Sequence, residues 1–285
     1  MAQRVSIIIP TYNRIQTLRK VIDSYLAQAC LHELIFVIDG SDDGTREYLE
    51  GLARLNPVIR IASHGRNLGV SVSRNDGIEL ATGDCILFGE DDLRLGKDYT
   101  STLLACMERS GADIIGGRIV YNRVGETDEE TLQRCNGYDR PLINYWIMSG
   151  YYAKRLPGDV EMPFLHAIAL AKADVCKRIR FDPAFFARED TDFYLRAVTA
   201  GYRVVYCPHT TCIHLPRDSG RGGGWRVGLL HYQILATKNN NMLVDRHFNV
   251  LKKWGMKGNR ATFKLLHLIN RVRIVYLYFR HSTKH

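Results

Sequence analysis

Short apolar runs alternate with amphipathic segments along most of this chain. The runs are rich in Val, Ile, Leu and Phe and are bounded by turn residues, which is typical of strands buried on both faces. They lie at 5–10, 34–38, 58–62, 85–88, 113–121 and 203–206. Between them apolar residues recur at helical spacing, so we predict helices at 15–29, 45–55, 71–81, 99–110 and 190–200. This alternation indicates an α/β fold with a mostly parallel sheet and helices on both faces.

Other segments lack a clear period. Residues 122–160 are rich in Gly, Arg and Tyr, and we interpret them as a long loop beside a substrate site. Residues 164–173 are strand-like or mixed, and 209–215 are expected to return to the edge of the site. Residues 217–225 contain four glycines, which predicts a hinge loop.

Three consecutive acids follow the strand predicted at 85–88: Glu90, Asp91 and Asp92. Adjacent carboxylates repel one another unless a cation neutralises them. Mg²⁺ and Mn²⁺ prefer carboxylate oxygens together with substrate phosphates, and ligands of open α/β sheets bind beyond the carboxyl ends of the strands. The motif therefore predicts a site for a metal and a diphosphate, although a solvated acidic turn would explain these acids taken alone.

Positive charge is concentrated at the C-terminal end of the chain. The whole chain carries +9, residues 216–285 carry +12 (14 Lys and Arg, 2 Asp and Glu), and the remainder carries −3. A helix is predicted at about 260–281, with an apolar stripe from Leu265 to Phe279 and basic residues beside it. The stripe fits an anionic membrane surface, and it fits packing on the catalytic domain or on a second subunit of a homo-oligomer equally well. Basic charge without a reading motif is weak evidence of nucleic acid binding.

Chain length and cysteine content limit the number of domains and the cellular compartment. A chain of 285 residues suits one large domain, or one domain with an extension. Its apolar runs are too short for a signal peptide core or a membrane span. Its seven cysteines lack CxxC spacing, so we expect reduced thiols and a cytoplasmic protein.

Six motifs occur in an order that resembles the nucleotide-sugar-dependent glycosyltransferases of family 2, which have the GT-A fold. They are PTYNR at 10–14, IDGSDDGT at 38–45, NLGVSVSRNDGIELATGD at 67–84, EDD at 90–92, AREDTDFYLR at 187–196 and His214. The resemblance implies a GT-A domain over 1–215, with its Rossmann-like sheet, and leaves 216–285 as a basic helical extension. It also implies a nucleotide-diphosphate sugar as donor, with a UDP-sugar favoured, Mn²⁺ or Mg²⁺ as cofactor, and a saccharide or lipid-linked acceptor.

The resemblance also implies residue roles. The donor would contact Pro10, Thr11, Tyr12, Asn13, Arg14, Asp39, Asn67, Arg74, Glu90 and Asp91, and the metal would be held by Asp91, Asp92 and His214. Many relatives have two acids where this chain has Ile38 and Asp39, which leaves the base identity open. Turn and cap roles remain alternatives for Arg14, Asn67 and Arg74, and a structural role remains one for His214.

Asp190, or else Glu189, would be the general base that deprotonates the acceptor, with helix N-capping as the alternative. The implied reaction is an inverting single displacement, carried out in the cytoplasm or at the cytoplasmic face of a membrane. A nucleotidyltransferase is the alternative enzyme, but PTYNR lacks the glycines of its usual phosphate loop. A nucleic-acid-binding protein that uses the basic tail is the alternative from another class.

Overall fold

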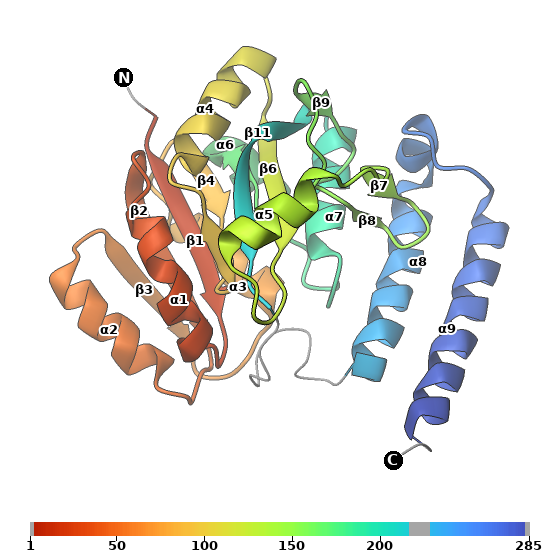
Figure 1. Cartoon of the computed structure of the whole chain (residues 1–285), viewed down its shortest axis with the longest axis horizontal. Coiled ribbons are helices and arrows are strands. Elements are labelled where there is room, and N and C mark those ends of the chain that lie inside the picture. The colour runs from red at the N-terminus through yellow and green to blue at the C-terminus, as the bar shows by residue number, and fades with distance from the viewer. Residues whose placement is uncertain (1–2, 217–228, 283–285) are drawn as a thin grey trace.

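The computed structural model describes residues 3–216 and 229–282. The hinge loop predicted at 217–225 lies outside these residues. Within them, nine strands form one sheet in the order β3-β2-β1-β4-β10-β6-β11-β5, and β9 pairs with β11 (Figure 1). These strands are β1 (Val5–Thr11), β2 (Leu31–Asp39), β3 (Ile59–His64), β4 (Cys85–Phe88), β5 (Leu93–Leu95), β6 (Ile114–Tyr121), β9 (Val160–Glu161), β10 (Leu170–Lys172) and β11 (Val204–His214). A separate pair consists of β7 (Ile143–Asn144) and β8 (Ser149–Gly150).

The sheet is mostly parallel, as predicted. Strands β3, β2, β1 and β4 run parallel to one another, and β6 is parallel to β11. Strand β10 is antiparallel to both β4 and β6, so it joins the two parallel groups with their carboxyl ends at the same edge. Short strands β5 and β9 add antiparallel pairs to β11. The ligand-binding edge predicted from the strand pattern is therefore continuous across the sheet.

Helices cover both faces of the sheet (Figure 1). On one face, Ile8 of β1 packs against Gly77 of a helix, and on the other, the next residue, Ile9, lies near Tyr25. Successive strand residues point to opposite faces, so one strand anchors both layers. The helices are α1 (Ile15–Leu26), α2 (Thr45–Leu55), α3 (Val70–Leu80), α4 (Tyr99–Ser110), α5 (Asp128–Asn136), α6 (Ala173–Ile179), α7 (Glu189–Thr199), α8 (Leu229–Lys253) and α9 (Arg260–Ser282).

Several elements differ from the sequence prediction. Strand β1 continues through Pro10 to Thr11, and α1 ends at Leu26 rather than at 29. The two strands expected at 203–206 and 209–215 are one strand, β11, whose pairing with β6 shifts register between Tyr206 and Thr211. The mixed segment at 164–173 holds only β10, followed by the unpredicted α6.

The segment 122–160 is not one long loop. It contains α5, β7, β8 and β9. Helix α5 begins with a capping box, in which Thr127 and Glu130 each accept a hydrogen bond from the other residue's backbone N–H. Its nine residues make too few turns for a clear apolar period, which is why the prediction was wrong here.

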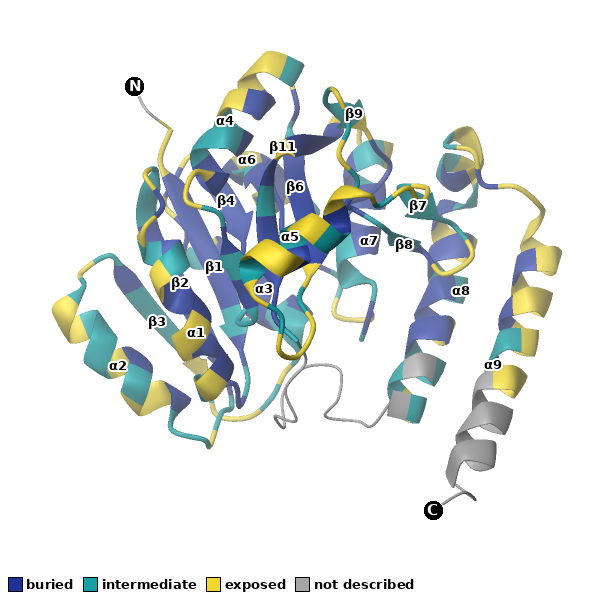
Figure 2. Cartoon of the chain, in the orientation of Figure 1, coloured by how far each residue is buried: buried dark blue, intermediate teal, exposed yellow. Residues whose placement is uncertain are grey.

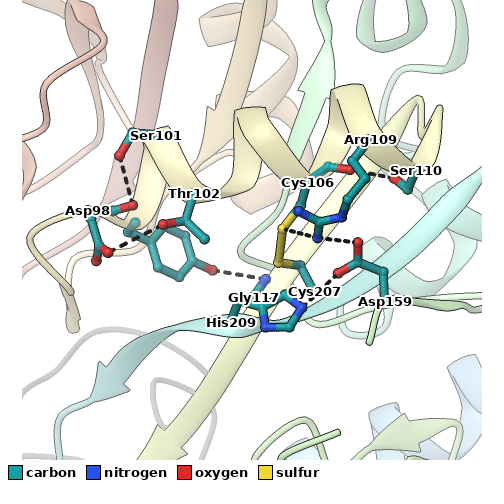
Figure 3. Close-up of a disulfide and its surroundings, with 11 residues drawn as sticks. Asp98, Ser101, Thr102, Cys106, Arg109, Ser110, Gly117, Asp159, Cys207 and His209 are labelled. Carbon is teal, nitrogen blue, oxygen red and sulfur yellow. Dashed lines mark hydrogen bonds and ion pairs between the residues drawn. A yellow bond between two sulfur atoms is a disulfide. The ribbon is translucent and has the colours of Figure 1, made fainter. Parts of the chain in front are cut away.

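Two of the seven cysteines are joined. Cys106 in α4 and Cys207 in β11 form a disulfide (Figure 3), and the other five are free. The prediction of reduced thiols throughout is therefore wrong for this pair. The two residues are 101 positions apart, and they meet because α4 packs across β11. Beside them Arg109 donates to Asp159 at 2.6 Å.

The C-terminal helices pack on the rest of the protein through α8. Helix α8 lies against α7, and α9 lies against α8 at the end of the molecule opposite β3 and α2 (Figure 1). Helix α9 confirms the helix predicted at about 260–281, whereas α8 was not predicted. No helix in the described part of the chain is long and apolar enough to cross a bilayer.

Candidate active site

A cavity of about 510 Å³ opens at the carboxyl edge of the sheet. That volume is within the usual range for small-molecule sites. It brings together almost every residue proposed from the sequence: Pro10, Thr11, Tyr12, Arg14, Asp39, Asn67, Arg74, Glu90, Asp91, Asp92, Glu189, Asp190 and His214. Asn13 is the exception. Its side chain accepts from the backbone N–H of Asp42 at 2.8 Å and so secures the loop before α2.

The three consecutive acids begin directly after β4, where the chain passes close to α1. A Cβ at Gly89 would lie 2.9 Å from Ile9 and 3.0 Å from Tyr25, so only glycine fits there without a shift of its neighbours. The Tyr25 hydroxyl donates to the Glu90 carbonyl at 2.8 Å and accepts from the Glu90 N–H at 3.1 Å. Glu90 is thereby held at the mouth of the cavity by its backbone.

Glu90, Asp92 and His214 form a group of potential metal ligands. Their ligand atoms all lie within 4.8 Å of one another. His214 Nδ1 lies 2.7 Å from the Leu215 carbonyl, to which it can only donate, so Nε2, which is 3.6 Å from Asp92, is the ring nitrogen left to bind a cation. Two carboxylates and an imidazole nitrogen suit Mn²⁺ and are compatible with Mg²⁺. The donor set therefore fits the expected cation.

Arg14 lies beside Asp91 and Asp92. Its guanidinium pairs with Asp92, and its Nε is 3.5 Å from Asp91. Burial and the neighbouring Asp92 nevertheless raise the pKa of Asp91 to about 7. Arg14 therefore lies at the cluster of three consecutive acids. Asp91 contacts Arg14 and is not part of the group of potential metal ligands. Its role as a metal ligand stays a prediction.

Arg74 links the two acidic segments of the site. It comes from α3, is 1% exposed, and donates to Glu189 at 2.8 Å and to Glu90 at 3.4 Å. Burial, followed by the charge of Asp92, raises the pKa of Glu90 to about 8, although Arg74 opposes that shift. Burial also raises the pKa of Glu189 against the effect of Arg74. One buried cation thus fixes acids that are 99 positions apart in the chain.

Asp190 has a different environment from Glu189. Its carboxylate accepts from the backbone N–H of Thr191 at 2.7 Å and lines the cavity. The first turn of α7 follows Arg188, which has a positive φ of 68°. Helix α8 holds this turn, because Asn239 accepts from the Ala187 N–H and Asn240 accepts from Arg188. Asp190 is thus partly exposed to the cavity, while Glu189 is engaged by Arg74.

The opposite end of the cavity is built around Asp39. Its carboxylate accepts from the backbone N–H groups of Leu68 at 2.7 Å and Gly69 at 2.9 Å, and from His64 at 2.8 Å. Asn67 donates to the Asp39 carbonyl at 3.2 Å. Asp39 therefore fastens the turn before α3 as well as lining the cavity, and Asn67 has the turn role that the sequence left as an alternative.

One wall of the cavity is formed by aromatic and histidine side chains that the sequence pattern did not predict. Tyr121 stacks on His214, with ring centroids 5.0 Å apart, and its hydroxyl lies 3.0 Å from Nε2 of His166. Burial lowers the pKa of His166 to about 3, so this imidazole is neutral. Tyr232 of α8 also lines the cavity. Position 166 falls in a segment without periodicity, and an isolated histidine there carried no signal.

Comparison with known proteins gives a family for this chain. The model of the family described as Glycosyl transferase family 2 matches residues 6–179. YibD of Escherichia coli, described as an uncharacterized glycosyltransferase, is 33% identical over 255 residues, which cover 85% of this chain and 73% of YibD. The glycosyltransferase GlyA of Streptococcus pneumoniae is 30% identical over 243 residues, covering 82% of this chain and 33% of GlyA.

Among curated relatives such as GlyA and the glycosyltransferase AglE of Haloferax volcanii, the match spans 33% and 40% of the relative's length. Two solved structures share the fold. Mannosyltransferase PcManGT of Pyrobaculum calidifontis, in complex with GDP-Man and Mn²⁺, has a TM-score of 0.60 at 17% identity, covering 94% of this chain and 69% of that one. TarS 1–349 of S. aureus with UDP has a TM-score of 0.57 at 15% identity, covering 93% and 69%.

Proposed function

The chain belongs to glycosyl transferase family 2 and has the GT-A fold, and on this premise we propose that it transfers a sugar from a nucleoside-diphosphate sugar to a saccharide or lipid-linked acceptor. One observation carries the proposal. A single cavity holds a metal-type donor set (Glu90, Asp92, His214) and a separate carboxylate, Asp190, at the start of a helix. Transfer needs both, because the diphosphate must leave as the acceptor loses its proton.

The proposed reaction is an inverting single displacement. The acceptor oxygen forms its bond to the anomeric carbon as the bond from that carbon to the diphosphate oxygen breaks, and Asp190 takes the acceptor proton. A bound Mn²⁺ or Mg²⁺ supplies positive charge for the departing diphosphate. Arg74 positions Glu90 and Glu189, so that Glu189 serves the site by holding Arg74 rather than by taking the proton.

The nucleoside is proposed to lie between Asp39 and the segment 10–14. Asp39 already accepts three hydrogen bonds, and a carboxylate has about four acceptor sites, so one remains for a base N–H or a ribose hydroxyl. Uracil and guanine both offer such a donor. Of the two solved structures that share the fold, TarS contains UDP and PcManGT contains GDP-Man. We propose a UDP-sugar as the donor for this chain.

We place the reaction in the cytoplasm, at the inner face of the membrane where the acceptor is lipid-linked. Family membership and the acids at 189–190 favour a glycosyltransferase over a nucleotidyltransferase. Neither observation supports nucleic acid binding by the basic tail.

The test replaces Asp190 with Asn, a near-isosteric change that removes the base. In a screen of UDP- and GDP-sugars with Mn²⁺ or Mg²⁺, we expect turnover by D190N to fall about 10²–10⁴-fold. Donor affinity, measured by calorimetry, should stay within about twofold, because a group that acts only on the acceptor proton stabilises the transition state and not the bound donor.

E189Q is the matched control, since it lies next to Asp190 but pairs with Arg74. We expect it to change turnover less than D190N does. Transfer by D190N within a few fold of wild type would make another group the base. A parallel collapse of donor affinity in D190N would instead put Asp190 at the donor or the metal.

A further inference from the structure

Helix α9 has apolar side chains on two opposite faces. On one, Phe263 is 1% exposed and stacks on Trp146, and His267 is 4% exposed and bonds to Asn241 and to the Trp146 carbonyl. Leu265 and Ile269 lie two residues beyond these two, about 200° around the helix. The inner face therefore attaches α9 to α8 and to the segment before β8, and the other face points away from them.

This outer face of α9 consists of Leu265, Leu268, Ile269 and Val272. Their exposed fractions are 57%, 57%, 54% and 64%, and their spacing places them on one continuous stripe. Single exposed apolar residues are ordinary on protein surfaces, whereas a contiguous apolar patch marks an interaction surface. The sequence left open whether this stripe packs on the catalytic domain, and in the described part of the chain it does not (Figure 2).

Basic side chains border the outer face on both sides. Lys264 and Arg273 are exposed and flank the stripe on opposite edges of the helix. Across residues 229–273 the sequence has nine Lys and Arg against one acid, Asp245. Lys264 pairs with that acid at 2.9 Å, but both side chains remain about half exposed, so the pair is weak and leaves the surrounding field positive.

We propose that the outer face of α9 docks on a membrane surface that carries anionic headgroups. The four aliphatic side chains would enter the boundary between headgroups and acyl chains, with Lys264 and Arg273 at the phosphates, as in amphipathic helices that lie in the interface. A second copy of the chain fits less well, because pairing two such faces would bring their basic borders together. The proposal rests on the proposed function only for its purpose, which is to bring the site to a lipid-linked acceptor.

The position of α9 in the fold suits this role. It forms the end of the molecule opposite β3 and α2 (Figure 1). Helix α8 lies between α9 and α7, whose first turn bears Asp190, and Tyr232 of α8 lines the cavity. Docking through α9 would therefore hold the side of the cavity that bears Asp190 closer to the membrane than the sheet edge formed by β3.

The test is flotation of the full chain with phosphatidylcholine vesicles, with and without phosphatidylglycerol. We expect binding to the anionic vesicles, weakening as ionic strength rises from about 0.05 M to about 0.5 M. L268Q/I269Q should reduce the partition onto anionic vesicles at least about tenfold, since burial of one such side chain is worth about a factor of ten or more. Glutamine preserves helix propensity.

L55Q/V124Q is the matched control, because Leu55 and Val124 are 79% and 88% exposed and lie outside α9 and the cavity. It should bind vesicles within about twofold of wild type, and circular dichroism and thermal unfolding check that both variants fold. Equal flotation of the two double variants would overturn the proposal. So would equal binding to neutral and anionic vesicles, or a wild-type dimer that L268Q/I269Q converts to monomer. Vesicle binding and oligomeric state are measured without donor or acceptor. Failure of the membrane proposal can therefore be distinguished from failure of the proposed transfer reaction.

Discussion

At the scale of single residues, this site is organised by two arginines that each hold a pair of acids in place. Arg14 pairs with Asp91 and Asp92, and Arg74 pairs with Glu90 and Glu189. Removing one partner from a buried pair leaves the other charge uncompensated, which costs far more than the pair gains. The two arginines therefore act on the geometry of the site, while Asp190 lines the cavity.

His64 gives a pH-dependent prediction at this scale. Burial opposes its protonation, but its bonds to Asp39 and Asp76, both at 2.8 Å, outweigh burial and raise its pKa above 6.5. A histidine with a raised folded pKa adds stability that is complete below its unfolded pKa and is lost as pH rises through the folded one. H64Q should therefore lower the melting temperature more at pH 5.5 than at pH 8.5.

The measurement is thermal unfolding of wild type and H64Q across that pH range. H231Q, which removes an exposed histidine of α8, controls for the loss of a histidine elsewhere. A difference between wild type and H64Q that is the same at both pH values would contradict the proposed charge on His64. The same variant should also weaken donor binding, because His64 orients Asp39.

At the scale of elements, the contact between α7 and α8 supports the first turn of α7, which bears Asp190. Asp192 is fully buried and meets His247 at 2.9 Å and Arg196 at 2.7 Å. Its hydrogen bonds to these two groups lower its pKa despite burial. Because Asp192 belongs to the same helix as Asp190, this cluster sets how α7 lies relative to the cavity.

D192N should destabilise the protein by about 3 kcal/mol, since it removes a fully buried counter-charge from Arg196 and weakens the hydrogen bond to His247. Denaturant unfolding measures the loss, and turnover should fall with it because the α7 turn is no longer held. D182N is the matched control: Asp182 pairs with Arg246 nearer the surface, with 29% of its side chain exposed, and should cost about 1 kcal/mol or less. Equal losses in the two variants would show that burial of the Asp192 cluster is not what stabilises this contact.

At the scale of the whole molecule, ligand binding to the acid cluster should stabilise the fold. The site collects Glu90, Asp91, Asp92, Glu189 and Asp190 around one cavity, so a bound cation relieves their repulsion in the native state alone. Ligand at about 100 times its Kd adds about 2.7 kcal/mol. For a chain of this size we expect Mn²⁺ with UDP to raise Tm by about 5 °C or more.

D92A should abolish that rise, while D139A, which removes an exposed acid paired with Lys154, should keep it. Differential scanning calorimetry with and without chelator provides the measurement. A full shift in D92A would remove Asp92 from the proposed ligands, and a shift with UDP alone would make donor binding independent of metal.

The sequence by itself determined the order and type of most elements and the location of the acids. Helices α2 and α4 have the predicted bounds, because amphipathic periodicity and terminal turn residues are local signals. Glu90 to Asp92 follow a buried strand, and parallel strands end at one edge, so their place in the cavity also follows from local pattern. Short, aperiodic elements such as α5 and α6 were missed because they carry little such signal.

The tertiary structure alone decided which side chains meet. Arg74 reaches Glu189, 115 positions away, Cys106 meets Cys207, and His166 reaches Tyr121. Such pairs depend on strand order, register and helix packing, which are properties of distant segments acting together and leave no mark in a local pattern. The same holds for α9: its sequence predicts an apolar stripe, and only the packing of Phe263 and His267 against Trp146 and α8 decides that the outer face stays exposed.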